Sequence, residues 1–176
     1  FRSVVVNPLP NVSVNPPAPF ICLNNTQVMT ASGASTYTWT PSANLSASTG
    51  ATVTANPTAT GTYTYTVVGT TAAGCTAQTT VQLGVNGLPN VTGNAIDYSI
   101  CFGSSTTLNA AGAVNYTWTP ATGLSATTGN TVTANPTTTT TYTVAGTSGL
   151  NCSDDDTVVV TVLDRKSTRL NSSHLV

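Results

Sequence analysis

Apolar and polar positions alternate along several short stretches of this chain. Residues 81–85 and 158–162 show the pattern most clearly, because an aliphatic side chain occupies every second position. Successive side chains of a strand point to opposite faces, so this period of two predicts β-strands with one buried face. No stretch has the apolar spacing of a helix, and Pro and Gly interrupt the chain too often for a long one.

Turn residues divide the first half of the chain into segments that we expect to be strands. A short helical turn is expected near residues 44–48. Several strands in about eighty residues, with frequent turns, are typical of an antiparallel β-sandwich. The expected strands are 27–31, 36–40, 52–55, 61–70 and 76–85.

The same segment occurs twice in the chain. Residues 37–41 and 116–120 both read Tyr-Thr-Trp-Thr-Pro, and residues 53–58 and 132–137 both read Val-Thr-Ala-Asn-Pro-Thr. A single shift of 79 positions relates both pairs. So many unlike residues agree that the chain contains an internal duplication.

The duplication predicts the domain organisation. Residues 8–86 form one repeat and residues 87–163 the next, so the fold class is all-β with two tandem sandwiches. Residues 4–10 resemble residues 83–89. We therefore expect residues 1–7 to be the last strand of a truncated preceding repeat.

The last thirteen residues do not continue the repeat. Residues 164–174 read Asp-Arg-Lys-Ser-Thr-Arg-Leu-Asn-Ser-Ser-His, which resembles the in-frame translation of a common short-read sequencing adapter. The alternative is a genuine basic tail. We interpret residues 164–176 as a non-native, adapter-derived tail of a metagenomic fragment that has no part in the function.

Charged residues make up only 5% of the chain. Within residues 1–163 they are Arg2 and four aspartates, so the basic footprint of a nucleic-acid-binding protein is absent. Regularly spaced Val, Thr, Tyr and Trp favour folded strands over an unfolded stalk. No apolar run approaches the twenty or so residues of a membrane span, so none is expected in this fragment.

Each repeat contains two cysteines at equivalent positions. The second repeat is shorter by two residues after Tyr63 and Tyr142, so that the four cysteines fall into the pairs Cys22 with Cys75 and Cys101 with Cys152. There is no CxxC motif and no histidine in residues 1–163, which favours disulfides over a metal site. Four cysteines allow three pairings, and the repetition favours the pairing within each repeat.

Such a bond would add about 4 kcal/mol of stability in the chain-entropy model. The alternative is a set of free buried thiols. Disulfides would place the protein outside the cytoplasm, in the extracellular space or at the cell surface.

Together these residues resemble a known module type. The order Ile-Cys, Tyr-x-Trp-x-Pro, Asn-Pro-Thr, Thr-Tyr-Thr-Val and a late Cys is similar to the immunoglobulin-like (PKD-like) repeats of Bacteroidota surface proteins, over residues 8–163. The resemblance implies large exported adhesins, gliding-type proteins or extracellular enzymes in which the repeats act as stalks, exported by the type IX secretion route. Cys75 follows Tyr63 by twelve residues, so the expected disulfide would join a strand start to a hairpin turn.

The residues predict no catalytic site, because residues 1–163 contain no His, Lys or Glu to activate a nucleophile. Trp39 and Trp118 could stack on sugars, but sandwich domains commonly bury one tryptophan on a central strand. We therefore expect both tryptophans in the cores, together with Tyr63 and Tyr142.

The run from Asp154 to Asp156 could bind Ca²⁺ through carboxylate oxygens. Adjacent strand residues point to opposite faces, so we expect a solvated strand start and no metal site. Asp156-Thr157-Val158 resembles an O-glycosylation site of such bacteria, which makes Thr157 a candidate.

The leading hypothesis is a structural spacer of an adhesin-like or fibre-forming protein of the cell surface, without catalysis or cofactor. Its expected partners are neighbouring repeats of the same chain, not nucleic acid. A second hypothesis is a module that binds a glycan or a surface protein through loops at one sandwich end. A third is the accessory stalk of a secreted hydrolase.

Overall fold

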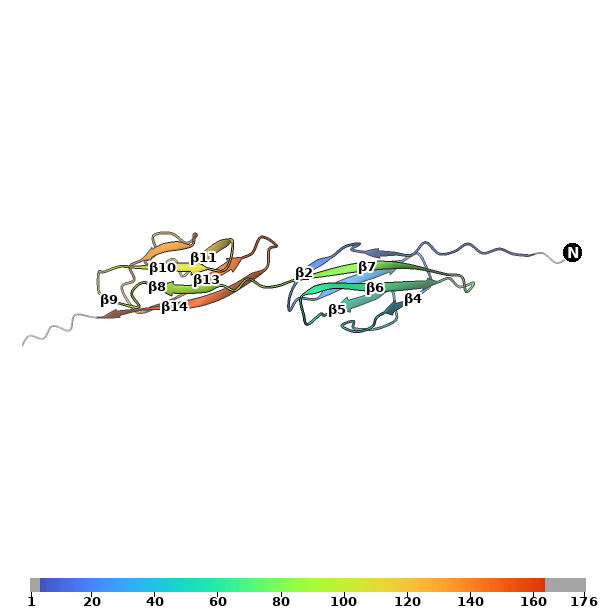
Figure 1. Ribbon diagram of the computed structural model, residues 1–176, viewed down its shortest axis with the longest axis horizontal. Helices are drawn as coiled ribbons and strands as arrows, with labels where there is room; N and C mark the ends of the chain where they lie inside the picture. Colours follow the sequence, from blue (N-terminus) through green and yellow to red (C-terminus); the bar gives the residue numbers. More distant parts are fainter. Residues whose placement is uncertain (1–3, 164–176) are drawn as a thin grey trace, which may run out of the picture. The chain divides into compact units, whose positions relative to one another are not determined.

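The computed structural model describes residues 4–163, and these are all-β without a helix (Figure 1). They divide into two compact units with the boundary between Gly87 and Leu88, one residue after the boundary expected from the sequence. Since residues 4–163 contain no helix, they contain no helix that could cross a membrane. The candidate adapter-derived tail, residues 164–176, lies outside the described residues.

The first unit is a sandwich of two sheets. One sheet has the strand order β1-β3-β5 and the other has the order β2-β7-β6-β4. Neighbouring strands are antiparallel except for β2, which lies parallel to the end of β7. The strands are β1 (Ser13–Asn15), β2 (Phe20–Cys22), β3 (Gln27–Ser32), β4 (Thr36–Thr40), β5 (Thr52–Ala55), β6 (Gly61–Thr70) and β7 (Thr76–Asn86).

The second unit repeats this topology. Its sheets have the orders β12-β10-β8 and β11-β13-β14-β9, and β9 lies parallel to the end of β14. Its strands are β8 (Thr92–Ala95), β9 (Ser99–Cys101), β10 (Thr106–Ala111), β11 (Asn115–Thr119), β12 (Thr131–Ala134), β13 (Thr140–Thr147) and β14 (Ser153–Leu163).

The five strands expected in the first repeat are present to within one residue at either end. The helical turn expected near residues 44–48 is wrong. That segment is held in extended contacts, because Leu45 bridges to Ala55 and the Trp39 amide donates to the Ser48 carbonyl at 2.8 Å. Residues 4–7 form no strand. The interpretation of residues 1–7 as the end of a preceding repeat stays a prediction, since the neighbours of such a strand would belong to that repeat.

Each unit has its own hydrophobic core between the two sheets. A tryptophan on the edge strand, a tyrosine on the strand beside it and the alternating aliphatic residues of the last strand fill both cores. The largest fully buried side chains are Trp39, Tyr65, Met29 and Leu83 in the first unit and Trp118, Tyr142 and Leu108 in the second.

The core tyrosine of the first unit is Tyr65 and not Tyr63. Tyr65 lies opposite Val81 and is fully buried, just as Tyr142 lies opposite Val158. Tyr63 is half-buried at the edge of the core, and its hydroxyl donates to the Ala59 carbonyl at 2.9 Å. The second repeat is therefore shorter by two residues before its core tyrosine and not after it. The missing residues correspond to the difference between β6, which has 10 residues, and β13, which has 8.

The two core tyrosines differ in how their hydroxyls are satisfied. The Tyr142 hydroxyl donates to the Thr122 carbonyl at 2.8 Å. The buried Tyr65 hydroxyl has no hydrogen-bond partner among residues 4–163. Burial raises the pKa of both phenols, so both are neutral at physiological pH.

This asymmetry predicts opposite outcomes for one substitution. Tyr142→Phe should destabilise the second unit by about 1 kcal/mol, because it removes a made hydrogen bond. Tyr65→Phe should leave the first unit equally stable or more stable, because it removes an unsatisfied buried hydroxyl. Urea unfolding followed by the amide NMR signals of each unit measures both effects, and equal losses in the two variants would contradict this assignment.

Candidate functional site

The two tryptophans hold an irregular segment against the edge strand of each unit. Trp39 is fully buried, and its indole Nε1–H donates to the Gly50 carbonyl at 2.9 Å. The Gly50 amide returns a bond to the Tyr37 carbonyl at 3.1 Å, with Gly50 at a φ of 109° that favours glycine. The rings are thus committed to the core and present no stacking platform for a sugar.

The second unit repeats this arrangement. Trp118 is fully buried and its Nε1–H donates to the Gly129 carbonyl at 3.0 Å. The Gly129 amide donates to the Tyr116 carbonyl at 3.2 Å, and Gly129 has a φ of 113°. The same three residue types therefore fix the same segment in both units.

The tyrosine two residues before each tryptophan closes the turn that leads into the edge strand. The Tyr116 hydroxyl accepts from the Ala113 amide at 2.7 Å and donates to the Ala113 carbonyl at 2.8 Å. The Tyr37 hydroxyl makes the same two bonds with Ala34, at 2.7 and 2.8 Å. Both hydroxyls are satisfied by backbone and are not available to a ligand.

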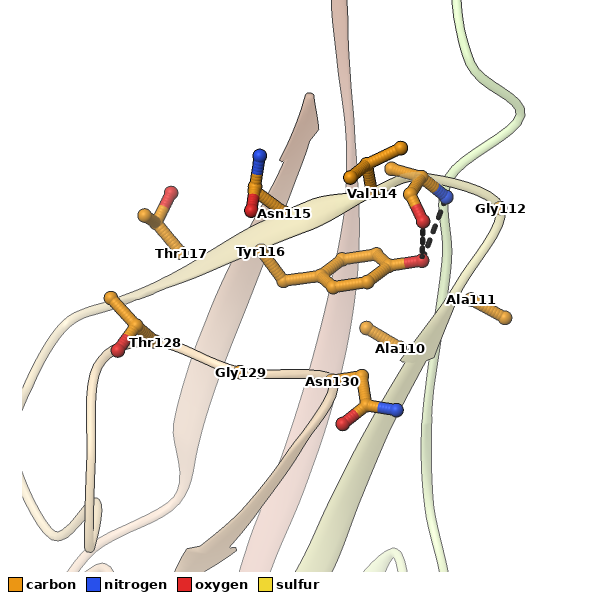
Figure 2. A pocket seen from close by; sticks show the side chains of 11 residues that line it. Ala110, Ala111, Gly112, Val114, Asn115, Tyr116, Thr117, Thr128, Gly129 and Asn130 are labelled. Carbon is orange, nitrogen blue, oxygen red and sulfur yellow. Dashed lines mark hydrogen bonds between the residues drawn. The ribbon is translucent and has the colours of Figure 1, made fainter. Parts of the chain in front are cut away.

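A shallow hollow lies beside the edge strand β11 and is the strongest candidate for a binding site (Figure 2). It has a volume of about 700 Å³. The ring of Tyr116 lies along it, with Thr128 and Asn130 on the facing segment. Its remaining walls are backbone and small side chains from residues 110–117.

The chemistry of this hollow is restricted to hydrogen bonding and apolar contact. Its only polar side chains besides the committed tyrosine are Asn115, Thr117, Thr128 and Asn130. None of these ionises at physiological pH, and no acid or base among the lining residues could activate a threonine hydroxyl. A smaller hollow of about 360 Å³ occupies the corresponding place in the first unit, lined by residues 35–38 and 49–51.

The cysteines do not form the bonds predicted from the sequence. Cys75 and Cys101 are free, whereas Cys22 and Cys152 are disulfide-bonded. The expected pairing within each repeat, Cys22 with Cys75 and Cys101 with Cys152, is therefore wrong.

The reason lies in the length of the last strand of each unit. Cys22 lies opposite Asn86, the last residue of β7, and Cys75 directly precedes Thr76, the first. A strand of 11 residues spans about 35 Å, whereas disulfide-bonded Cα atoms lie about 4–7 Å apart. Cys101 and Cys152 are separated in the same way by the 11 residues of β14.

The aspartate run does not converge on a common point. No group of three acidic, cysteine or histidine side chains within residues 4–163 is placed to hold a metal ion. Asp154 and Asp155 are exposed at the start of β14. The candidate glycosylation residue Thr157 is also exposed on β14, and its modification stays a prediction.

Asp156 has a structural role that the sequence did not reveal. Its carboxylate accepts from the Gly93 amide of β8 and from the Thr157 amide, both at 2.8 Å, and so joins β8 to β14. These two hydrogen bonds lower the pKa of Asp156. The close approach of β8 requires glycine, because a Cβ on Gly93 would lie 2.8 Å from the Val158 side chain.

The second unit should consequently be the more acid-sensitive of the two. A carboxylate whose pKa is depressed by folding contributes stability above its unfolded pKa of about 3.9, and this is lost as pH falls through the lower folded value. The first unit has Thr79 at the corresponding position. Unfolding of each unit followed by NMR between pH 6 and 2 should show the excess loss in the second unit below about pH 4.

Asp156→Asn is the matched variant for this measurement, because it keeps the shape of the side chain and removes its charge. It should abolish the excess acid sensitivity of the second unit. Unchanged sensitivity in the variant would contradict this role of Asp156.

Comparison with solved structures places the fold. The structure superposes on the N-terminal eight immunoglobulin domains of Down Syndrome Cell Adhesion Molecule isoform 1.30.30 with a TM-score of 0.56 and 16% sequence identity. The superposition covers 87% of this chain and 24% of that one. Each unit is an immunoglobulin-like β-sandwich. The chain spans about a quarter of the length of that protein's solved structure, and at this identity the likeness extends to the fold alone.

Two further matches have lower structural similarity. The fibronectin(III)-like modules of Clostridium thermocellum CbhA give a TM-score of 0.43 at 11% identity, over 94% of this chain and 99% of that one. Titin domains I67–I69 give a TM-score of 0.42 at 13% identity, over 89% of this chain and 67% of the titin chain. No protein-family model matches the sequence, and no curated protein matches it either.

Proposed function

We propose that the two modules are structural spacers of an extracellular or cell-surface protein of the adhesin or fibre type, without catalysis. The observation that carries the proposal is what the modules have in common. They share the buried tryptophan bonded to a glycine carbonyl and the tyrosine bonded to a turn alanine. The groups that line the hollows differ, since Asn115 and Asn130 correspond to Thr36 and Ala51. Duplication has thus kept the scaffold and varied the surface.

The disulfide-bonded state of Cys22 and Cys152 supports an oxidising location outside the cytoplasm. The resemblance of residues 8–163 to PKD-like repeats supports a Bacteroidota parent protein exported by the type IX route. On this proposal the partners of each module are neighbouring repeats of the same chain. Residues 164–176 remain interpreted as adapter-derived.

A second function is binding of a glycan or a surface protein, favoured by the presence of a hollow at the same place in both modules. Its donors and acceptors in the second module are amides and hydroxyls, which suit an uncharged, hydroxyl-rich ligand. Saturable shifts of the amide signals of residues 128–130 on addition of oligosaccharides would favour this function. The role of stalk to a secreted hydrolase is the third reading, and it uses the modules as spacers as well.

Stretching single molecules in reducing buffer tests the spacer function. Each module should unfold in one discrete step, because its two sheets share one core. Residues 13–86 extended at about 3.6 Å per residue span roughly 270 Å, so each step should lengthen the chain by about 230 Å after the folded length of about 35 Å is subtracted.

Trp118→Ala provides the matched control for the stretching experiment. It should abolish or weaken the step of the second module and leave that of the first unchanged, since the two cores are separate. Gradual extension of the unsubstituted chain without discrete steps would contradict the spacer function.

A further inference from the structure

The four cysteines occupy two structural positions. Cys75 and Cys152 directly precede the last strand of their modules, and we call them the hairpin cysteines. Cys22 and Cys101 lie on the short strand parallel to the end of that last strand, and we call them the parallel-strand cysteines. One cysteine of each kind is disulfide-bonded and one of each kind is free. Both positions are therefore able to form disulfides in this fold.

Cys75 contacts the backbone of the segment that precedes the first module. Its thiol donates a weak hydrogen bond to the Asn7 carbonyl at 3.8 Å. Asn7 corresponds to Asn86 by the 79-residue shift of the duplication. Asn86, in turn, is the register partner of the parallel-strand cysteine Cys22. A parallel-strand cysteine of a preceding module would thus lie next to the residue that Cys75 already contacts.

The hairpin also holds Cys75 in the same frame as its bonded counterpart. The Cys75 amide donates to Thr71 Oγ1 at 3.1 Å, and the Thr71 amide donates to the Cys75 carbonyl at 2.9 Å. Cys152 exchanges the same two bonds with Ser148, at 3.2 and 2.8 Å. The free hairpin cysteine is therefore as well positioned by its turn as the one that carries a disulfide.

We propose that Cys75 is the site of a disulfide between modules, and that its partner is the parallel-strand cysteine of a module of the same kind joined directly before residue 8. The proposal deepens the spacer function and rests on it. Two thiols lose two protons and two electrons to form the bond, and a small-molecule disulfide such as oxidised glutathione takes these up and is released as two thiols. Such a bond would link two modules across a connecting segment of the kind seen at residues 87–91, which belong to no strand.

Lengthening the chain by one module tests the proposal. A second copy of residues 8–86, carrying Cys75→Ser so that the chain keeps a single Cys75, is inserted between Asn7 and Pro8 of the full chain, and Asn86 of the copy takes the place of Asn7. After refolding with oxidised and reduced glutathione, Cys75 should resist alkylation by iodoacetamide, whereas in the original chain it should react. A digest without reductant should contain Cys75 joined to Cys22 of the inserted copy.

The matched control carries Cys22→Ser in the inserted copy alone, and there Cys75 should again be alkylated. A chain whose tryptophan fluorescence reports folded modules but whose Cys75 is alkylated, or is joined to a different cysteine, would overturn the proposal. That result would leave the spacer function standing, because the stretching experiment is made under reduction and needs no disulfide.

A second measurement uses the original chain and does not depend on folding of the longer one. A peptide of residues 18–24, activated at its cysteine as a mixed disulfide with an aromatic thiol, is exchanged onto the folded protein. The ratio of labelling at Cys75 to labelling at the exposed Cys101 should rise severalfold over that given by a scrambled peptide. An unchanged ratio would show that Cys75 does not recognise the parallel strand and would contradict the proposal.

Discussion

In each module an indole N–H in the middle of the core donates to a glycine carbonyl at the surface, Trp39 to Gly50 and Trp118 to Gly129. A buried N–H without a partner would cost about 1–3 kcal/mol, so the largest side chain of the core can be buried only if that glycine segment is in place. The segment in turn depends on the edge strand, because the glycine amide bonds to the carbonyl of Tyr37 or Tyr116. Core, edge strand and loop therefore form one cooperative unit.

This dependence accounts for what the surface of the molecule offers. The two tryptophans and the tyrosines two residues before them are committed to the core or to backbone partners, and the carboxylate of Asp156 is committed to Gly93 and Thr157. Phe20, Tyr98 and Phe102 stay exposed. Threonine, serine and alanine make up much of the remaining exposed surface of residues 4–163. This commitment of aromatic and carboxylate groups to the fold supports the spacer function proposed above.

The strands with alternating side chains could be predicted from the sequence, because a period of two is a local signal that the sandwich only reinforces. The sequence does not indicate strands β1 and β2, since segments of three residues beside prolines carry no periodicity and become strands only by pairing with β3 and β7. The disulfide prediction is wrong for the same reason. Because β2 lies parallel to the end of β7, Cys22 lies at one end of that strand and Cys75 at the other. The sequence does not separate Tyr63 from Tyr65, because both repeats contain Thr-Tyr-Thr, and only the register with Val81 and Val158 distinguishes them. The Asp156 contact joins residues 63 positions apart, which a single sequence does not reveal.

Hydrogen exchange of the two indole N–H groups tests the dependence of each module on its tryptophan most directly. If the indole bond closes the core, Trp39 and Trp118 should exchange as slowly as the central amides of β6 and β13, because both require opening of the whole module. Indole protons that exchange at the rate of exposed loop amides, while the strand amides stay protected, would show that the glycine segment opens independently and would contradict the account.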